Sequence, residues 1–145
     1  MKEVGTHRIR IIDFNNAFLV ESVVRLSQNS EFIKKSTEVF QTSDEATEII
    51  STNKKRASRV KRIADAGMFT GTVGIWVNVI DSTLNESRSE QNLITILGIF
   101  AIVFGTGLIR AISKDKETKT SQQLLAISEM KNSGENSFAK TYPFE

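Results

Sequence analysis

Two uncharged apolar runs, separated by a short acidic segment, constrain this chain more than any other feature. The runs cover residues 66–80 and 91–109, and residues 81–90 lie between them. The second run has 19 residues without a charge, and as a helix it is about 28 Å long, which matches a hydrocarbon core roughly 30 Å thick. The first run reaches this length when residues 63–65 are included. The pattern predicts a two-span transmembrane helical hairpin.

Lysine and arginine beside the runs predict how the hairpin is oriented, because these residues resist translocation. Six of them precede the first run, four follow the second, and the loop contains only Arg88. We therefore expect both termini in the cytoplasm and residues 82–90 on the far side, in a bacterial inner membrane or a virion or organelle membrane. We also expect the first six to contact anionic lipid headgroups. These headgroup residues are Lys54, Lys55, Arg56, Arg59, Lys61 and Arg62.

Small residues in the two runs predict how the spans pack. Helices in lipid associate through close backbone contact, which small side chains permit. The first run places four small or polar residues at i, i+4, i+7 and i+11, so they share one helical face. We expect this face to meet a similar face of the second run, with a second copy or another subunit as the alternative partner. The expected neighbours are Gly67 with Gly105 or Thr106, Gly71 with Ala101 or Ile102, Gly74 with Gly98, and Asn78 with Thr95.

Three polar residues have competing interpretations. Asp65 could carry a proton, but it follows Lys61 and Arg62 at helical spacing, which favours an interfacial ion pair. His7 is the only histidine and has no other metal-type ligands arranged around it, so we expect a surface residue and no metal or cofactor. Asn85 begins a glycosylation sequon, which has meaning only in a secretory membrane.

The segment before the hairpin predicts helices. Residues 13–26 and 31–41 each place apolar side chains on one side of a helix. Thr42 and Glu45 fit a capping box, and the helix that they open continues into the membrane. Residues 7–14 alternate basic and apolar side chains like a strand, but a single strand has no partner. We expect residues 1–62 to form a cytoplasmic N-terminal helical region.

The segment after the hairpin predicts one more helix. Thr120 begins a second capping-box match, and the apolar residues that follow it suit a cytoplasmic C-terminal helix over residues 111–131. Residues 132–145 are expected to be a disordered tail. With the hairpin at residues 63–110, its spans at about 63–81 and 91–110 and its loop at 82–90, the predicted fold is an all-α membrane protein.

The sequence shows no catalytic constellation. There is no cysteine, no phosphate-binding glycine loop and no paired nucleophile and base, so we expect no enzyme. The positive charge concentrates beside the apolar runs, which gives no support to nucleic-acid binding.

Three functional hypotheses fit this layout. The first is a non-catalytic structural or accessory subunit of a membrane assembly, such as a secretion, respiratory or virion complex, with the bilayer and other subunits or copies of itself as partners. The second is a holin-like or toxin-like oligomer that forms a pore. The third is a soluble all-helical binding protein in which both runs are buried core helices.

Overall fold

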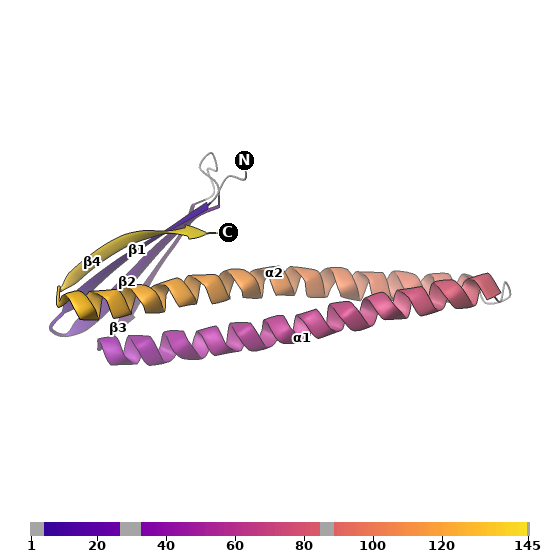
Figure 1. The fold of residues 1–145 in the computed structure, drawn as a ribbon, viewed down its shortest axis with the longest axis horizontal. Coiled ribbons are helices and arrows are strands. Elements are labelled where there is room, and N and C mark those ends of the chain that lie inside the picture. Colours follow the sequence, from indigo (N-terminus) through magenta and orange to yellow (C-terminus); the bar gives the residue numbers. More distant parts are fainter. Residues whose placement is uncertain (1–4, 27–32, 85–88, 145) are drawn as a thin grey trace. The chain divides into compact units, whose positions relative to one another are not determined.

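The fold combines an antiparallel sheet with two long helices. The computed structural model describes residues 5–26, 33–84 and 89–144. In chain order the elements are β1 (Gly5–Phe14), β2 (Ala17–Arg25), β3 (Ile33–Phe40), α1 (Ser43–Leu84), α2 (Ser89–Ser133) and β4 (Ser137–Phe144), as Figure 1 shows. The expectation of an all-α chain is therefore wrong, and the fold is α+β.

The chain divides into two compact units. Met1–Lys55 and Lys116–Glu145 form the first, here called the sheet unit, and Arg56–Asp115 forms the second, here called the hairpin unit. The sheet unit contains all four strands, the first turns of α1 and the last turns of α2. The hairpin unit contains the rest of both helices.

The sheet has the strand order β3-β2-β1-β4, and every neighbouring pair is antiparallel. β1 pairs with β2 across a two-residue turn, from Phe14 opposite Ala17 to Thr6 opposite Arg25. On its other side β1 pairs with β4, where Gly5 lies opposite Phe144. The strand over residues 7–14 that lacked a partner thus has two, and one of them comes from the other end of the chain.

Three segments expected to be helical or disordered form the other three strands of the sheet. Residues 13–26 and 31–41, expected as helices, contain β2 and β3, and the expected tail 132–145 contains β4. Alternation explains β2, because every second side chain from Phe18 to Val24 is buried, as a strand with one covered face requires. β-branched valines in this segment also favour a strand over a helix.

The helix expected to begin at the first capping box does begin there. The Thr42 hydroxyl accepts a hydrogen bond from the backbone N–H of Glu45 at 3.2 Å. The Glu45 carboxylate accepts one from the N–H of Gln41 at 2.7 Å, one residue before the position a capping box predicts. α1 then continues without a break to Leu84, which confirms the expected continuous helix.

The second capping-box match is wrong, because α2 runs unbroken through it. The Thr120 hydroxyl donates to the carbonyl oxygens of Lys116 and Glu117, at 2.8 and 3.0 Å. It therefore bonds to the preceding turn of a continuing helix and does not cap the start of a new one. Helices α1 and α2 also extend into the expected loop 82–90, to Leu84 and from Ser89. Asn85 and Arg88 lie outside the described residues.

The core of the sheet unit lies between one face of the sheet and the helix ends that cover it (Figure 1). The strands contribute alternate large apolar side chains, and the helices contribute alanine, isoleucine and methionine side chains that lie against them. Burial of this surface stabilises the unit, at roughly 25 cal/mol for each Å² of apolar area removed from water. The core residues are Ile9, Ile11, Phe18, Val20, Phe40, Ala46, Ile50, Ala126, Ile127, Met130 and Tyr142.

Candidate functional site

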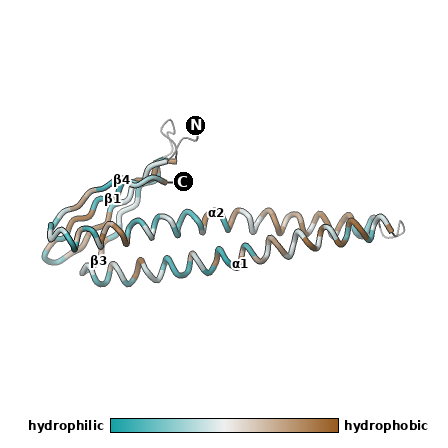
Figure 2. The backbone as a smooth tube through the Cα atoms, in the orientation of Figure 1, coloured by the Kyte–Doolittle hydropathy of each residue, from teal (hydrophilic) through white to brown (hydrophobic). Residues whose placement is uncertain are grey.

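Both helices of the hairpin unit are long and apolar enough to cross a membrane. Figure 2 shows the apolar residues of α1 and α2 concentrated in the parts of the helices nearest to residues 85–88. Only 6% of the most apolar 18-residue stretch of each helix is buried. A core helix of a soluble protein would be mostly buried, whereas here Phe69 is 74% exposed and Ile94 is 72% exposed. Exposure of this kind suits a lipid environment.

A polar contact between α1 and α2 lies at each end of the apolar part of the hairpin. At one end Arg110 of α2 forms an ion pair with Asp65 of α1. At the other end the Asn92 side-chain amide donates to the Asp81 carboxylate at 2.8 Å. The helical segments between these contacts are about 22 and 25 Å long at 1.5 Å per residue. This length is a few ångströms short of a typical hydrocarbon core, a mismatch that thinning and snorkelling accommodate.

The expected partners of Asp65 were Lys61 and Arg62 on its own helix. The structure pairs Asp65 with Arg110, which arrives from α2 in the antiparallel register of the hairpin. This ion pair joins the two helices, whereas the expected one would have joined neighbouring turns of α1.

Three threonine hydroxyls within the hairpin are satisfied by their own helix. Thr72 donates to the Met68 carbonyl oxygen at 2.8 Å, and Thr95 donates to that of Gln91 at 2.9 Å. Thr106 donates to two carbonyl oxygens of the preceding turn. An unsatisfied polar group in hydrocarbon costs several kcal/mol, so back-bonding of this kind lets threonine occupy a lipid-facing helix. The arrangement gives these hydroxyls no need for water.

The glycines of the first span do lie against α2. A Cβ placed at Gly67 would be 3.4 Å from Thr106 Cγ2, and one placed at Gly74 would be 3.3 Å from Ile99 Cδ1. At Gly71 it would overlap Val103 Cγ2. Of these three glycines, Gly71 leaves the least room for a side chain, so the close approach of α1 to α2 depends most on glycine at position 71. Thr106 was one of the two neighbours expected for Gly67.

The second span presents a different face from the expected one. Gly98 and Gly105 would have open space beside an added Cβ, and Ala101 is exposed. Branched side chains such as Ile99 and Val103 lie against the first-span glycines instead. A role for Gly98, Ala101 and Gly105 in packing against a second copy or another subunit remains a prediction.

The expected Asn78–Thr95 contact is replaced by bonds within each helix. The Asn78 amide donates to the Gly74 carbonyl oxygen at 2.8 Å, and the Thr95 hydroxyl donates within α2. Each residue thus meets its hydrogen-bonding need locally, as polar side chains in apolar surroundings must.

A seven-residue repeat in the sequence identifies the residues that lie at the interface between α1 and α2. On α1 the partly or fully buried positions Ala57, Ala64, Gly71 and Asn78 are seven apart, and on α2 so are Asn92, Ile99, Thr106 and Ser113. A strict seven-residue repeat keeps one seam in contact along two helices. Glycine spacing alone picks out the right face of the first span. The seven-residue repeat is what picks out the right face of the second.

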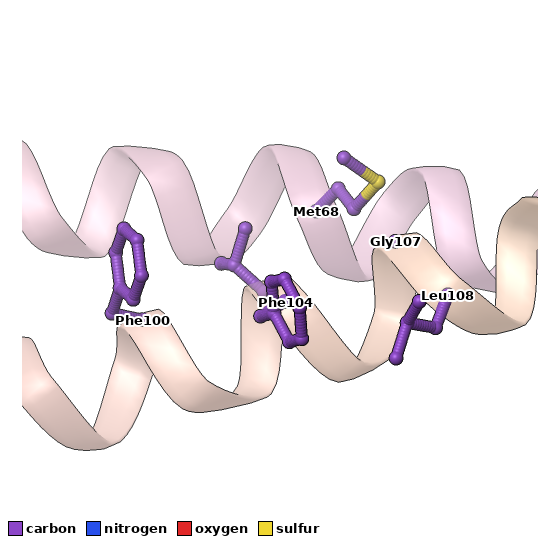
Figure 3. A pocket seen from close by; sticks show the side chains of 6 residues that line it. Met68, Phe100, Phe104, Gly107 and Leu108 are labelled. Atoms are coloured by element: carbon purple, nitrogen blue, oxygen red, sulfur yellow. The ribbon is translucent and has the colours of Figure 1, made fainter.

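An open apolar groove of about 290 Å³ lies on the hairpin unit (Figure 3). Met68 of α1 forms one side, and Phe100 and Phe104 of α2 line the other, with Gly107 leaving the space between them open. The lining contains almost no polar surface, so hydrocarbon is the environment that it suits.

The six headgroup residues all lie on α1, on both sides of the boundary between the units. Lys54 and Lys55 belong to the sheet unit and the other four to the hairpin unit. The three arginines, Arg56, Arg59 and Arg62, are exposed, and Ala57 and Ala64 between and beyond them are buried. The segment therefore has a packed side and a cationic side, and contact of the cationic side with lipid headgroups remains a prediction.

His7 is fully buried in the sheet unit, so its expected surface position is wrong. Its Nδ1 lies 2.6 Å from Gln122 Oε1, while the Gln122 amide nitrogen donates to the Pro143 carbonyl oxygen. Since Oε1 can only accept, Nδ1 carries the proton. Nε2 is buried and has no hydrogen-bond partner among the described residues, and the Phe144 ring meets the imidazole edge to face. Burial lowers the pKa of His7 from 6.5, only partly opposed by the Gln122 hydrogen bond.

Two further contacts extend a polar layer between α2 and the sheet. Buried Gln123 donates to the Ser22 hydroxyl of β2 at 2.8 Å. Lys119 donates to the Ser36 hydroxyl of β3 at 2.8 Å. Burial lowers the pKa of Lys119, although Glu38 raises it. Together with His7 these bonds fix which face of α2 meets the sheet, because a rotated helix would leave buried polar groups unpaired.

No feature of the described residues identifies a reaction. Within residues 5–26, 33–84 and 89–144, no group of three or more His, Asp or Glu side chains is placed to hold a metal ion. Comparisons with protein-family models, with curated proteins and with solved structures gave no significant match.

Proposed function

We propose that this chain is a non-catalytic integral membrane protein whose hairpin unit anchors the sheet unit at a membrane, where the sheet unit serves as an accessory part of a larger assembly. One observation carries the proposal. β4 pairs with β1 along eight residues, so segments from before and after the hairpin build one folded sheet. A hairpin whose two ends return to the same domain is an anchor for that domain.

The same pairing supports a topology with both termini on one side. β1 and β4 would be separated by the bilayer if only one of the two helices crossed it. Two crossings keep them together, and the excess of lysine and arginine on both flanks favours the cytoplasmic side. The loop region between the helices then lies on the far side.

A pore is the competing function, and the hairpin supports it less well. A water-filled pore needs polar groups that face its lumen. In the described hairpin the threonine hydroxyls named above are bonded within their own helices, and residues 66–80 and 93–109 contain no charge. These features suit a lipid-facing anchor. The all-helical soluble protein is not retained, since the chain has a sheet and its apolar helices are exposed.

The test separates the anchor from the domain. In one variant an unrelated two-span hairpin replaces residues 63–110, and in another Ile9→Asp disrupts the core of the sheet unit. We expect the first variant to retain the migration of the native assembly in mild detergent and the second to lose it while staying in the membrane. Dye leakage from vesicles that contain the intact protein, together with loss of leakage on hairpin replacement, would establish a pore instead.

A further inference from the structure

The outer face of the sheet has a polarised pattern of side chains. Alternation along each strand sends one set of side chains to the core and the other set to the opposite face. On that outer face Ile12, Leu19 and Val39 lie directly opposite one another across three strands. Val39 is 66% exposed and Phe14, at the same end of β1, is 53% exposed. One end of the outer face is thus an apolar row without cover among the described residues.

The other end of the outer face is cationic. Arg8 and Arg10 of β1 are exposed, and Arg8 lies opposite Val23, which in turn lies opposite Lys35. Four basic residues share this face with one acidic residue, Glu21, which leaves a net charge of +3 among its described positions. No ion pair among the described residues involves these four. They are Arg8, Arg10, Arg25 and Lys35.

We infer that the outer face of the sheet docks an acidic, amphipathic segment of a partner protein, with apolar side chains on the Ile12–Leu19–Val39 row and carboxylates on Arg8 and Arg10. Charge complementarity selects this occupant, because opposite potentials steer and orient a partner on such a surface. A second copy of the chain would bring another face of charge +3 against the first, which is repulsive. The inference rests on the proposed function and names the chemistry of the partner.

Strand geometry sets the spacing that the partner must match. Alternate residues of a strand are about 7 Å apart, so Arg10 and Arg8 lie about 7 and 14 Å from Ile12 along β1. A helix rises about 5.4 Å per turn, so acidic residues one to three turns from its apolar anchors reach both arginines. The apolar row alone would hold many partners weakly, and the two arginines make the surface selective for acidic ones.

The probe is a pair of designed helical peptides of about 15 residues. Both carry leucines at the same helical spacing, and their remaining positions are glutamate in one and lysine in the other. The full-length protein is held in nanodiscs of uncharged phosphatidylcholine, and peptide binding is followed by fluorescence anisotropy. We expect the glutamate peptide to bind at least about tenfold more tightly than the lysine peptide, with a dependence on salt.

Two variants assign the binding to the sheet. Arg8→Glu with Arg10→Glu should weaken the glutamate peptide about tenfold or more, and Val39→Asp should also weaken it. The control, Thr52→Glu with Asn53→Glu, adds negative charge at two exposed positions of α1 outside the headgroup residues and should leave affinity within about twofold. An unchanged His7 imidazole spectrum verifies that each variant is folded. Equal binding of both peptides, or loss of binding only in the α1 control, would overturn the inference.

The same samples distinguish other occupants of the outer face. If Arg8→Glu with Arg10→Glu abolishes binding to vesicles that contain phosphatidylserine while the glutamate peptide never binds, the face contacts lipid and the inference is wrong. If the native protein is a dimer that those charge reversals dissociate, and the glutamate peptide does not bind, the face docks a second copy and the inference is also wrong. Retention of the protein in carbonate-washed membranes reports on the proposed function separately, so a failed docking test leaves the anchor standing.

Discussion

Arg110 of α2 forms an ion pair with Asp65 of α1, and the apolar part of each helix begins at the next residue toward the loop. The ion pair therefore marks where each helix changes from a charged to an uncharged sequence. Its two side chains are 45% and 46% exposed, so its contribution to stability is small in spite of its position.

A double-mutant cycle measures that contribution. We expect Asp65→Asn and Arg110→Gln to couple by no more than about 0.5 kcal/mol, because solvent screens exposed ion pairs. The free energy of unfolding in detergent, followed by circular dichroism, gives the coupling. A coupling of several kcal/mol would mean that the pair is desolvated and lies deeper in the apolar phase than this account places it.

Gly71 is the position where the hairpin tolerates a side chain least. Gly71→Leu should separate the helices, since even a Cβ there overlaps Val103. The measurement is the rate of disulfide formation between Gly67→Cys and Thr106→Cys in this cysteine-free chain. Gly98→Leu is the matched control and should leave that rate unchanged, because Gly98 has open space beside it. Equal slowing by both substitutions would show that the interface uses the other face of α2.

His7 should make the sheet unit less stable in acid. Its folded pKa lies below 6.5, and in an unfolded chain its pKa is about 6.5, so the unfolded state binds a proton that the folded state rejects. The stabilising effect is complete above about 6.5 and is lost as the pH falls from there toward the folded pKa. Unfolding free energies from pH 8 to 5 should decline for the native chain and change less for His7→Phe. An imidazole signal that titrates above 6.5 would contradict the assignment.

The only tyrosine reports on how β4 is held. Tyr142 donates to Glu129 at 3.2 Å, and Lys140 contacts the same carboxylate at 3.0 Å. Burial, followed by the Glu129 charge, raises the pKa of Tyr142 to about 12. Ultraviolet titration should show this value in the native chain and a lower one in Glu129→Gln. The associated stability is present below the unfolded pKa of about 10 and is lost as the pH rises toward 12.

The hairpin was more predictable from the sequence than the sheet, and contact range explains the difference. The start of α1 follows from local residues, since Thr42 and Glu45 are three apart. The partner of β1 on one side is β4, more than a hundred residues away, and no local pattern in β1 reveals it. The alternation of Ile9 and Ile11 with arginines is typical of a strand. A strand needs partners, however, and the local sequence of residues 13–26 and 132–145 predicts a helix and a disordered tail.

Polar residues on the helix-facing side of the sheet explain why the sequence did not predict β2 and β3. Ser22 occupies a core position of β2 and is satisfied by Gln123, so the apolar alternation is interrupted there. In β3 the side chains that face the helices include Ser36 and Glu38, as an edge strand permits, and no apolar period remains. A second long-range hydrogen bond, from His7 to Gln122, 115 residues away along the chain, explains why His7 is buried although the sequence predicts a surface position.

The anchor account is tested most directly by the sidedness of three positions. Single cysteines replace Thr42, Asn85 and Ala139 in turn, and sealed vesicles of known orientation are treated with a maleimide that cannot cross the membrane. We expect positions 42 and 139 to react from the cytoplasmic side only and position 85 to react from the opposite side only. Labelling of all three positions from the same side would contradict a membrane-spanning hairpin.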